Sequence, residues 1–154
     1  SLKVAAENFC LSKNNKKIKV VRLSNLYGPN FSNQVYLLPS LIRDSLKKKK
    51  IKILINKKSK KNYLYVNDAI KIILKIINKS KYRIYNIASN KRISLENIAL
   101  TIKEATNCKI VYKNQNIRLN EPIININRIK KEYNFKSENN FEKLIFKIIK
   151  DSKY

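Results

Sequence analysis

The sequence predicts an α/β fold with a mostly parallel sheet. Short runs rich in β-branched residues alternate along the chain with segments whose apolar residues recur at helical spacing. Because this alternation is typical of βαβ units, the strands are expected to be parallel, with helices packed on the sheet. No repeat or flexible linker interrupts the 154 residues, and 44% of them are hydrophobic, so we expect one unit with a sizeable core.

The first expected elements are a helix, a buried strand and a second helix. Residues 2–13 are predicted to form a helix whose inward face carries Ala5, Ala6, Phe9 and Cys10. The run IKVVRLSN at 18–25 then predicts a buried strand of a parallel sheet. The second helix is indicated by an apolar stripe of Leu37, Leu38, Leu41, Ile42 and Leu46. The lysine run 47–50 suits its C-terminal end, where cations meet the negative end of the helix dipole.

The middle of the chain is expected to add three strands and one helix. The runs at 51–55 and 62–66 alternate like strands, and YRIYNIA at 82–88 predicts a further buried strand. Asn67 is placed to cap a helix that extends from residue 68 to residue 77.

The last third is expected to contain three helices and one strand. Ser94 can cap a helix that continues to Glu104, and Ile93 and Ile98 have the spacing of a hydrophobic staple around that cap. A strand at 109–112, a loop at 118–122 and a short helix at 127–133 follow. The terminal helix is indicated by a stripe of Phe141, Leu144, Ile145, Ile148 and Ile149.

The composition limits the kinds of site that these residues can form. His is absent, and Cys10 and Cys108 lack paired metal-ligand spacing, so we expect no metal site and interpret both cysteines as core thiols. The single glycine, Gly28, excludes a glycine-rich phosphate loop. Because Met is absent, we expect that residues precede Ser1 in the reading frame. No apolar run is long enough to span a bilayer and no secretory signal is present, so a cytoplasmic location is expected.

The formal charge of +25 raises the alternative of a nucleic-acid or polyanion-binding protein. The lysines are, however, spread along the whole chain together with abundant Asn and Ile, the three residues that A/T-rich codons encode. Phe9 and Phe141 belong to apolar stripes rather than alternating with lysine on one face. A solvated surface shaped by coding bias is therefore favoured over a nucleic-acid patch.

Five segments, in order, resemble the extended short-chain dehydrogenase/reductase family, which comprises nucleotide-sugar epimerases and dehydratases. SLKVAAE is similar to the end of the family's Tyr-x-x-x-Lys helix, and RLSNLYGP to its Arg-x-x-Asn-x-Tyr-Gly-Pro stretch. KKNYLYVNDAI resembles the Arg-Asp-aromatic segment, YNIASNKRISLENIA the Tyr-Asn-Ile strand and following helix, and RLNEP the Arg-Pro-Gly-Asp-Pro loop. Each match is short, so the order and spacing carry the resemblance.

The resemblance implies the C-terminal part of a Rossmann-type doubly wound parallel sheet, plus the family's smaller α/β substrate-binding subdomain. Residues 1–154 would then form the C-terminal half of an NAD(P)-dependent epimerase/dehydratase domain. The dinucleotide-binding half with its glycine loop would lie upstream, as would the catalytic tyrosine, two positions before Ser1.

By this resemblance, Lys3 is the active-site lysine: its ammonium lowers the pKa of the tyrosine, and it also bonds the nicotinamide ribose. The backbone near Leu23 and Leu26 would lie beside the nicotinamide, and Asn25 would contact the substrate. The alternatives are that Lys3 is one more surface lysine and that Asn25 merely forms a turn.

Two basic residues match the family's diphosphate-binding arginines. Lys61 aligns with the first, although Lys60 could equally be the aligned residue. Lysine keeps the positive charge of arginine but cannot form two parallel hydrogen bonds to a phosphate. Arg118 matches the second, with a solvent-exposed role as the alternative. Asp68, near a helix start, is interpreted as structural, and Tyr65 and Tyr85 as core aromatics.

The resemblance therefore implies part of an enzyme that transfers a hydride between NAD or NADP and a nucleotide-diphosphate sugar. The parent would form a homodimer through the helix at 2–13, and the 154 residues alone are expected to be inactive. Epimerase, dehydratase and reductase chemistry stay open, as does the choice of sugar. A polyanion-binding protein and a non-catalytic remnant of the family are the two functions that compete with this interpretation.

Overall fold

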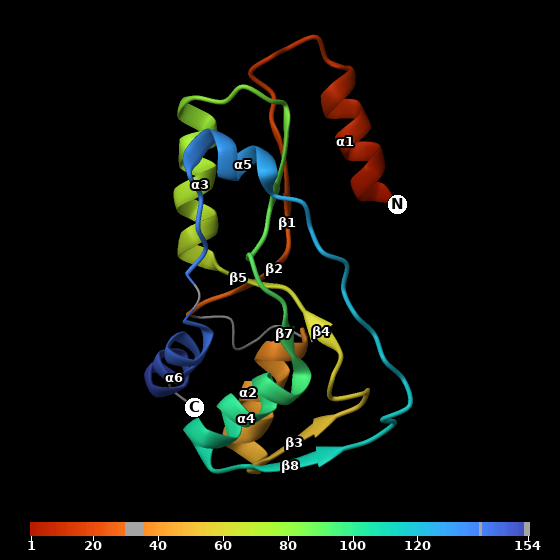
Figure 1. The fold of residues 1–154 in the computed structure, drawn as a ribbon, viewed down its shortest axis with the longest axis vertical. Helices are drawn as coiled ribbons and strands as arrows, with labels where there is room; N and C mark the ends of the chain where they lie inside the picture. The colour runs from red at the N-terminus through yellow and green to blue at the C-terminus, as the bar shows by residue number, and fades with distance from the viewer. Residues whose placement is uncertain (30–35, 139, 153–154) are drawn as a thin grey trace.

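The computed structural model describes residues 1–29, 36–138 and 140–152 (Figure 1). Its strands form pairs, and three of these pairs are parallel, as the alternation predicts. The parallel pairs are β1 (Val20–Leu23) with β6 (Ile84–Ile87), β2 (Asn25–Tyr27) with β5 (Tyr63–Tyr65), and β3 (Lys50–Ile53) with β8 (Lys109–Tyr112). The short strands β4 (Lys60–Lys61) and β7 (Ile93–Ser94) pair antiparallel.

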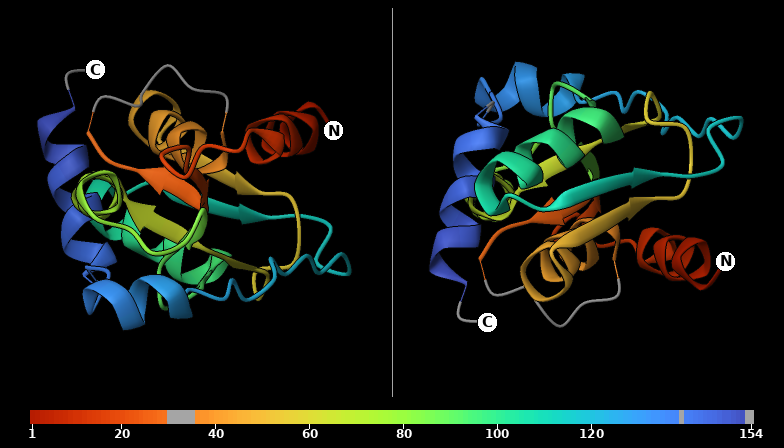
Figure 2. Two further views of the ribbon diagram at one scale, coloured as in Figure 1. Left: turned by 90° about the horizontal axis from the view of Figure 1, so that it is seen from above. Right: turned by 90° about the horizontal axis from the view of Figure 1, so that it is seen from below.

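The upper part of the molecule is built on the β1–β6 pair. Helices α1 (Leu2–Ser12) and α3 (Val66–Asn78) lie on opposite sides of this pair, as the view from above shows (Figure 2). The short helix α5 (Asn127–Tyr133) packs against β6 and α3. The core of the upper part consists of buried apolar residues in or next to β5, α3, β6 and α5: Leu64, Ala69, Ile72, Ile76, Tyr85, Ile87, Ala88, Ile126 and Ile129.

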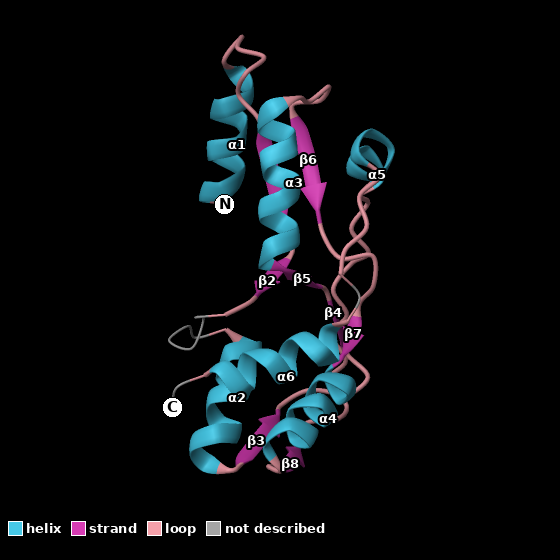
Figure 3. Cartoon of the chain, turned by 90° about the vertical axis from the view of Figure 1, so that its left-hand side faces the viewer, coloured by secondary structure: helices cyan, strands magenta, loops and turns pink. Residues whose placement is uncertain are grey.

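The lower part is built on the β3–β8 pair. Helices α2 (Leu37–Lys48) and α4 (Leu95–Thr106) pack on it, and α6 (Phe141–Asp151) packs on α4 (Figure 3). Its larger core includes the fully buried Leu38, Ile51, Ile98, Ile102 and Ile145. Ser94 caps α4 by accepting a hydrogen bond from Asn97 N at 3.1 Å, as predicted. Ile93 and Ile98, the predicted staple residues, both belong to this core.

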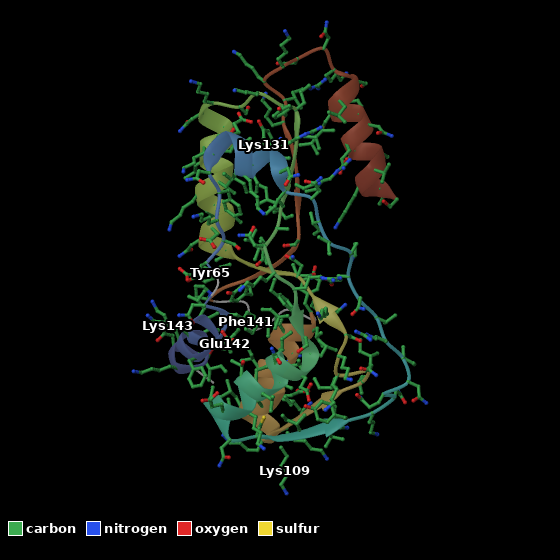
Figure 4. The ribbon with its side chains drawn as sticks, viewed as in Figure 1. Tyr65, Lys109, Lys131, Phe141, Glu142 and Lys143 are labelled. Atoms are coloured by element: carbon green, nitrogen blue, oxygen red, sulfur yellow. The ribbon has the colours of Figure 1, made fainter. Side chains whose placement is uncertain are left out.

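An aromatic cluster lies where the two parts meet. The ring of Tyr27 lies 5.2 Å from that of Phe141 and 5.5 Å from that of Tyr65, measured between centroids. Figure 4 shows Phe141 at the start of α6 and Tyr65 at the foot of α3. Because these rings come from β2, β5 and α6, their packing joins the upper strands to the lower helices.

Two predictions about the first elements are wrong. No residue of α1 is buried, and Phe9, expected to face inward, is 64% exposed beneath the ammonium of Lys13, while Cys10 is half-buried. The run at 18–25 forms two strands, and Arg22 and Leu23 in β1 are exposed. The reason is that, among the described residues, β1 pairs with β6 alone and no element covers α1.

A third correction concerns the start of α3. The helix begins at Val66 with Tyr65 as N-cap, so Asn67 lies inside the first turn and does not cap it. Asp68 accepts a hydrogen bond from Glu138 N at 2.6 Å, which agrees with a structural role. The core assignment is confirmed for Tyr85, which is fully buried, and for Cys108, while Tyr65 packs against the core partly buried.

The single glycine is required for close packing between β2 and α3. Gly28 is buried, and a Cβ at this position would overlap Val66 Cγ1 and lie 3.2 Å from Val66 Cβ. Val66 cannot move aside easily because a β-branched side chain has few χ1 choices.

We therefore expect Gly28→Ala to lower the free energy of unfolding by about 1–3 kcal/mol through overpacking. Adding Val66→Ala to this variant should restore part of the loss, because it removes the methyl groups that clash. Urea unfolding of both single variants and the double variant would measure this. Strictly additive losses would show that Val66 is not the group that excludes a side chain at Gly28.

Candidate functional site

A groove of about 790 Å³ lies at the carboxyl end of β1, where the chain turns into β2. Its walls come from α1, the β1–β2 turn, the start of α2, β4, β5 and the segment that precedes α5. Five of the six residues predicted from the sequence line it: Lys3, Leu23, Asn25, Leu26 and Lys61. The fold thus brings residues together that are up to 58 positions apart in the chain.

Asn25 is held by a set of hydrogen bonds at the floor of this groove. Its side-chain amide donates to both carboxylate oxygens of Glu121 at 3.0 Å and to the backbone oxygen of Asn62 at 3.0 Å. The amide nitrogen is therefore fixed toward Glu121. The side-chain oxygen takes no part in these three hydrogen bonds and can accept one from a ligand.

Glu121 is the central residue that sequence reasoning missed. Besides Asn25, its carboxylate accepts a hydrogen bond from Asn62 N at 2.7 Å and forms an ion pair with Lys61 Nζ at 3.3 Å. The only signal in the sequence is its place in RLNEP, at the position of the family's aspartate. The resemblance points instead to Arg118 in that segment, yet Arg118 is exposed and does not line the groove.

The structure also distinguishes the two candidate lysines. Lys61 is half-buried in the groove and paired with Glu121. Lys60 is exposed, and its backbone N–H donates to Asn120 Oδ1 at 2.9 Å. The positive charge in the groove therefore comes from Lys61 and, across the groove, from the exposed Lys3 on α1.

Asn62 joins the groove to the loop after β6. It is 3% exposed, and its side chain both donates to Ser89 O and accepts from Ser89 N, each at 3.0 Å. Through its backbone the same residue contacts Asn25 and Glu121. One buried asparagine thus fixes the relative positions of β2, β5 and the loops at residues 89 and 121.

No buried tyrosine of the groove is suited to act as a base. Burial, and to a lesser extent the Glu121 carboxylate, raise the pKa of Tyr63 above its ordinary value. A phenol with its ordinary pKa of about 10 is already protonated at neutral pH, and the higher pKa of Tyr63 makes it a still poorer base. Ser24 contributes a different group: its hydroxyl oxygen is buried and lacks a hydrogen-bond partner among the described residues.

These features define the class of protein. The groove lies at the carboxyl end of parallel strands and carries amide, carboxylate and ammonium groups on its walls, and this is where open-sheet α/β proteins bind their ligands. Residues 2–88 match the NAD dependent epimerase/dehydratase family. This match covers more than half of the chain, so the protein belongs to that family. Comparison with curated proteins finds no match.

Solved structures with the same fold span twice this length. UDP-N-acetylglucosamine 4-epimerase from Bacillus cereus matches 96% of this chain over 50% of its own, with a TM-score of 0.79 and 25% identity. RMD from Pseudomonas aeruginosa, complexed with NADPH, matches 97% over 53%, with a TM-score of 0.80 and 19% identity. The UDP-glucose 4-epimerase from Thermotoga maritima, solved with UDP-glucose, matches 96% over 49%, with a TM-score of 0.78 and 18% identity. The chain thus spans about half of the structures that it matches.

Replacing the buried asparagine tests its role in organising the groove. Asn62→Ala should lower the free energy of unfolding by about 1–3 kcal/mol, because both backbone groups of Ser89 would lose a buried partner. Asn67→Ala is the matched control: this asparagine is exposed, and its loss should change stability by less than about 0.5 kcal/mol. Equal denaturation midpoints for the two variants would contradict the role that we assign to Asn62.

Proposed function

We propose that residues 1–154 serve as the substrate-side half of an NAD(P)-dependent enzyme that acts on a nucleotide-diphosphate sugar. The observation that carries this proposal is the groove, in which Lys3, Asn25 and Lys61 meet at the carboxyl end of β1. Family membership supports it, as does the structural similarity to a UDP-N-acetylglucosamine 4-epimerase and to a UDP-glucose 4-epimerase solved with UDP-glucose. An epimerase, dehydratase or reductase would all fit this arrangement.

The groove offers groups for both parts of such a substrate. Asn25 presents an amide oxygen that can accept a hydrogen bond from a sugar hydroxyl, and Lys61 can contact a diphosphate oxygen once a ligand competes with Glu121. Glu121 keeps Lys61 near the groove wall when no anion is present. Arg118 is exposed outside the walls of this groove, so its contact with the diphosphate stays a prediction from the resemblance alone.

Only one end of the dinucleotide cofactor fits the residues that this chain provides. Leu23 and Leu26, each 42% exposed at the groove, offer an apolar wall for a nicotinamide ring, and Lys3 can reach its ribose. The unpartnered hydroxyl of Ser24 is a further polar group at this position. The cofactor diphosphate has no comparable place, because the chain contains one glycine and no glycine-rich loop. When bound, the nicotinamide would accept or return a hydride.

The role that we propose for Lys3 is electrostatic. The family's tyrosine base would come from the same helix, one turn earlier, and a phenol ionises only near pH 10 without help. The ammonium of Lys3 stabilises the phenolate and so lowers that pKa. The residues of this chain thus prepare a base and orient a sugar, while the dinucleotide-binding half supplies the remaining groups.

Exposed apolar surface around the β1–β6 pair supports the existence of that half. Leu2 and Val4 on α1 are 91% and 55% exposed. On the opposite side, α3 carries an exposed stripe of Ile70, Leu74 and Ile77 at i, i+4 and i+7 spacing. We propose that residues 1–154 are the C-terminal half of the domain and that these surfaces pack against the dinucleotide-binding half. Part of α1 would then be available for a homodimer contact.

The polyanion-binding alternative has less support. Lysines such as Lys109 point away from the body of the protein (Figure 4). The aromatic rings of the junction, by contrast, are packed inside, so they do not alternate with lysines on a common surface. Phe9 is the exception, since it is exposed beside Lys13.

Among the described residues, no helix has the length and apolarity needed to cross a membrane.

The 154-residue chain by itself should bind NAD and NADP with a Kd no tighter than about 1 mM and should not turn over nucleotide sugars. The reason is that it offers no site for the cofactor diphosphate and no tyrosine base. Titration calorimetry with each dinucleotide would measure the affinity. Micromolar binding would overturn the assignment of these residues to the substrate side alone.

In a polypeptide that joins this chain to its dinucleotide-binding half, Lys3→Met should remove most of the turnover at neutral pH. Turnover should partly recover at alkaline pH, where the phenol ionises without the ammonium. Lys13→Met, at the other end of the same helix, is the control and should leave the pH profile unchanged. A pH profile of Lys3→Met equal to that of the parent would refute the catalytic role of Lys3.

Asn25→Ala, in the same polypeptide, should instead raise KM for the sugar nucleotide.

A further inference from the structure

Helix α1 carries Lys3 but has almost nothing of its own to fix its position. None of its residues is buried, its N-cap Ser1 makes no side-chain cap, and its last turn holds no basic residue. A helix of 11 residues with no packed face is marginal in water. The contacts that α1 does make are therefore decisive for where Lys3 lies.

The first of these contacts is an ion pair between α1 and β1. Arg22 Nη2 lies 2.6 Å from Glu7 Oε2, and Arg22 Nε lies 3.0 Å from each carboxylate oxygen. The two side chains thus meet in the bidentate geometry that only arginine provides. A glutamate is ionised at neutral pH, and hydrogen bonding to Arg22 lowers the pKa of Glu7 further.

The second contact caps the C-terminal end of α1 from the adjacent strand. Arg83, immediately before β6, donates to the backbone oxygens of Leu11 at 2.8 Å, Cys10 at 2.9 Å and Lys13 at 3.1 Å. Carbonyls in the last turn of a helix have no partner within the helix, and a cation there also complements the dipole. The backbone of Arg83 is itself fixed, because its oxygen accepts a hydrogen bond from Val20 N at 2.7 Å.

Together the two contacts set both the direction and the rotation of α1. The C-terminal end of the helix lies at the start of β6, and its middle lies along β1, so α1 runs antiparallel to both strands (Figure 1). Lys3 and Glu7 are four residues apart and share one face of the helix. With Glu7 held on Arg22, Lys3 is directed toward the carboxyl end of β1, where it lines the groove.

We propose that Arg22 and Arg83 are positioning residues that dock α1 on the β1–β6 pair and thereby place Lys3 at the groove. The docking of α1 is inferred from the contacts of Arg22 and Arg83 described above. The effect of docking on turnover rests, in addition, on the function proposed for Lys3.

Docking can be measured in the 154-residue chain through its two cysteines. Cys10 lies half-buried on α1, whereas Cys108 is buried in the lower core and reports global unfolding. The labelling rate of each thiol by a disulfide reagent would be compared among Arg22→Met, Arg83→Met and the parent. Arg83→Met should speed labelling of Cys10 by about tenfold, because three hydrogen bonds to a charged group are lost, and Arg22→Met by a smaller factor. The rate at Cys108 should stay parental.

Two further variants separate docking from general damage. Arg128→Met is the matched control, since Arg128 on α5 also donates to a backbone oxygen of β6, that of Ile84 at 2.8 Å, but contacts no residue of α1. It should leave Cys10 labelling unchanged. Arg22→Lys keeps the charge and loses the fork, so it should lie between the parent and Arg22→Met. Faster labelling of Cys108 in Arg83→Met would mean that this variant unfolds globally. The test of docking would then be the labelling of Cys10 in Arg22→Met. Parental labelling of Cys10 in Arg22→Met and Arg83→Met would overturn the proposal.

The catalytic consequence has its own readout in the joined polypeptide. Misplacing Lys3 should move the pH profile of kcat toward alkaline pH for Arg83→Met, in the same direction as Lys3→Met but by less. A loss of folded protein alone would lower kcat equally at every pH, and that result would refute the positioning role. Faster Cys10 labelling combined with a parental profile for Lys3→Met would preserve the docking and refute the function assigned to Lys3.

Discussion

The carboxylate of Glu121 is the point on which the groove depends. It lies in a segment without helix or strand, yet it accepts hydrogen bonds from the Asn25 side chain and the Asn62 backbone and pairs with Lys61. Each of these partners belongs to a different short strand or turn. A single negative charge among amide donors and an ammonium therefore sets the positions of the groups that we expect to meet a substrate, and it does so within a protein of formal charge +25.

Buried hydrogen bonding extends this arrangement into the core. Asn62 is buried and Ser89 is half-buried, and each provides hydrogen-bond partners for the other, so neither can turn away without leaving a polar group unpaired. Asn62 also lies between two strands with different partners, since β4 pairs with β7 and β5 pairs with β2. On one side of Asn62, Lys61 lines the groove, and on the other, Tyr63 and Leu64 enter the two cores.

The two sides of the groove differ in how firmly they are held. The floor is supported by buried residues of both cores, whereas α1 is attached through polar contacts at the surface. Surface ion pairs stabilise weakly and are screened by salt, so the position of α1 is the more sensitive of the two. This difference, together with the exposure of Leu2 and Val4, agrees with our proposal that α1 packs against a dinucleotide-binding half.

Local patterns in the sequence were enough to predict the helices, most of the longer strands, their order and the family, but not the split of residues 18–25 into β1 and β2 or the short strands β4 and β7. Helical stripes such as that of α6, the Ser94 cap and the strand at 109–112 follow from periodicity and capping chemistry, which act over a few residues. Short motifs at fixed spacing placed Lys3, Asn25 and Lys61 among the candidates. The folded chain was needed to show that Glu121 joins them and that Arg118 does not, because a contact across 96 positions leaves no local pattern. The exposure of Phe9 was hidden for a similar reason: periodicity identifies an apolar face, but the packing of distant elements determines what covers it.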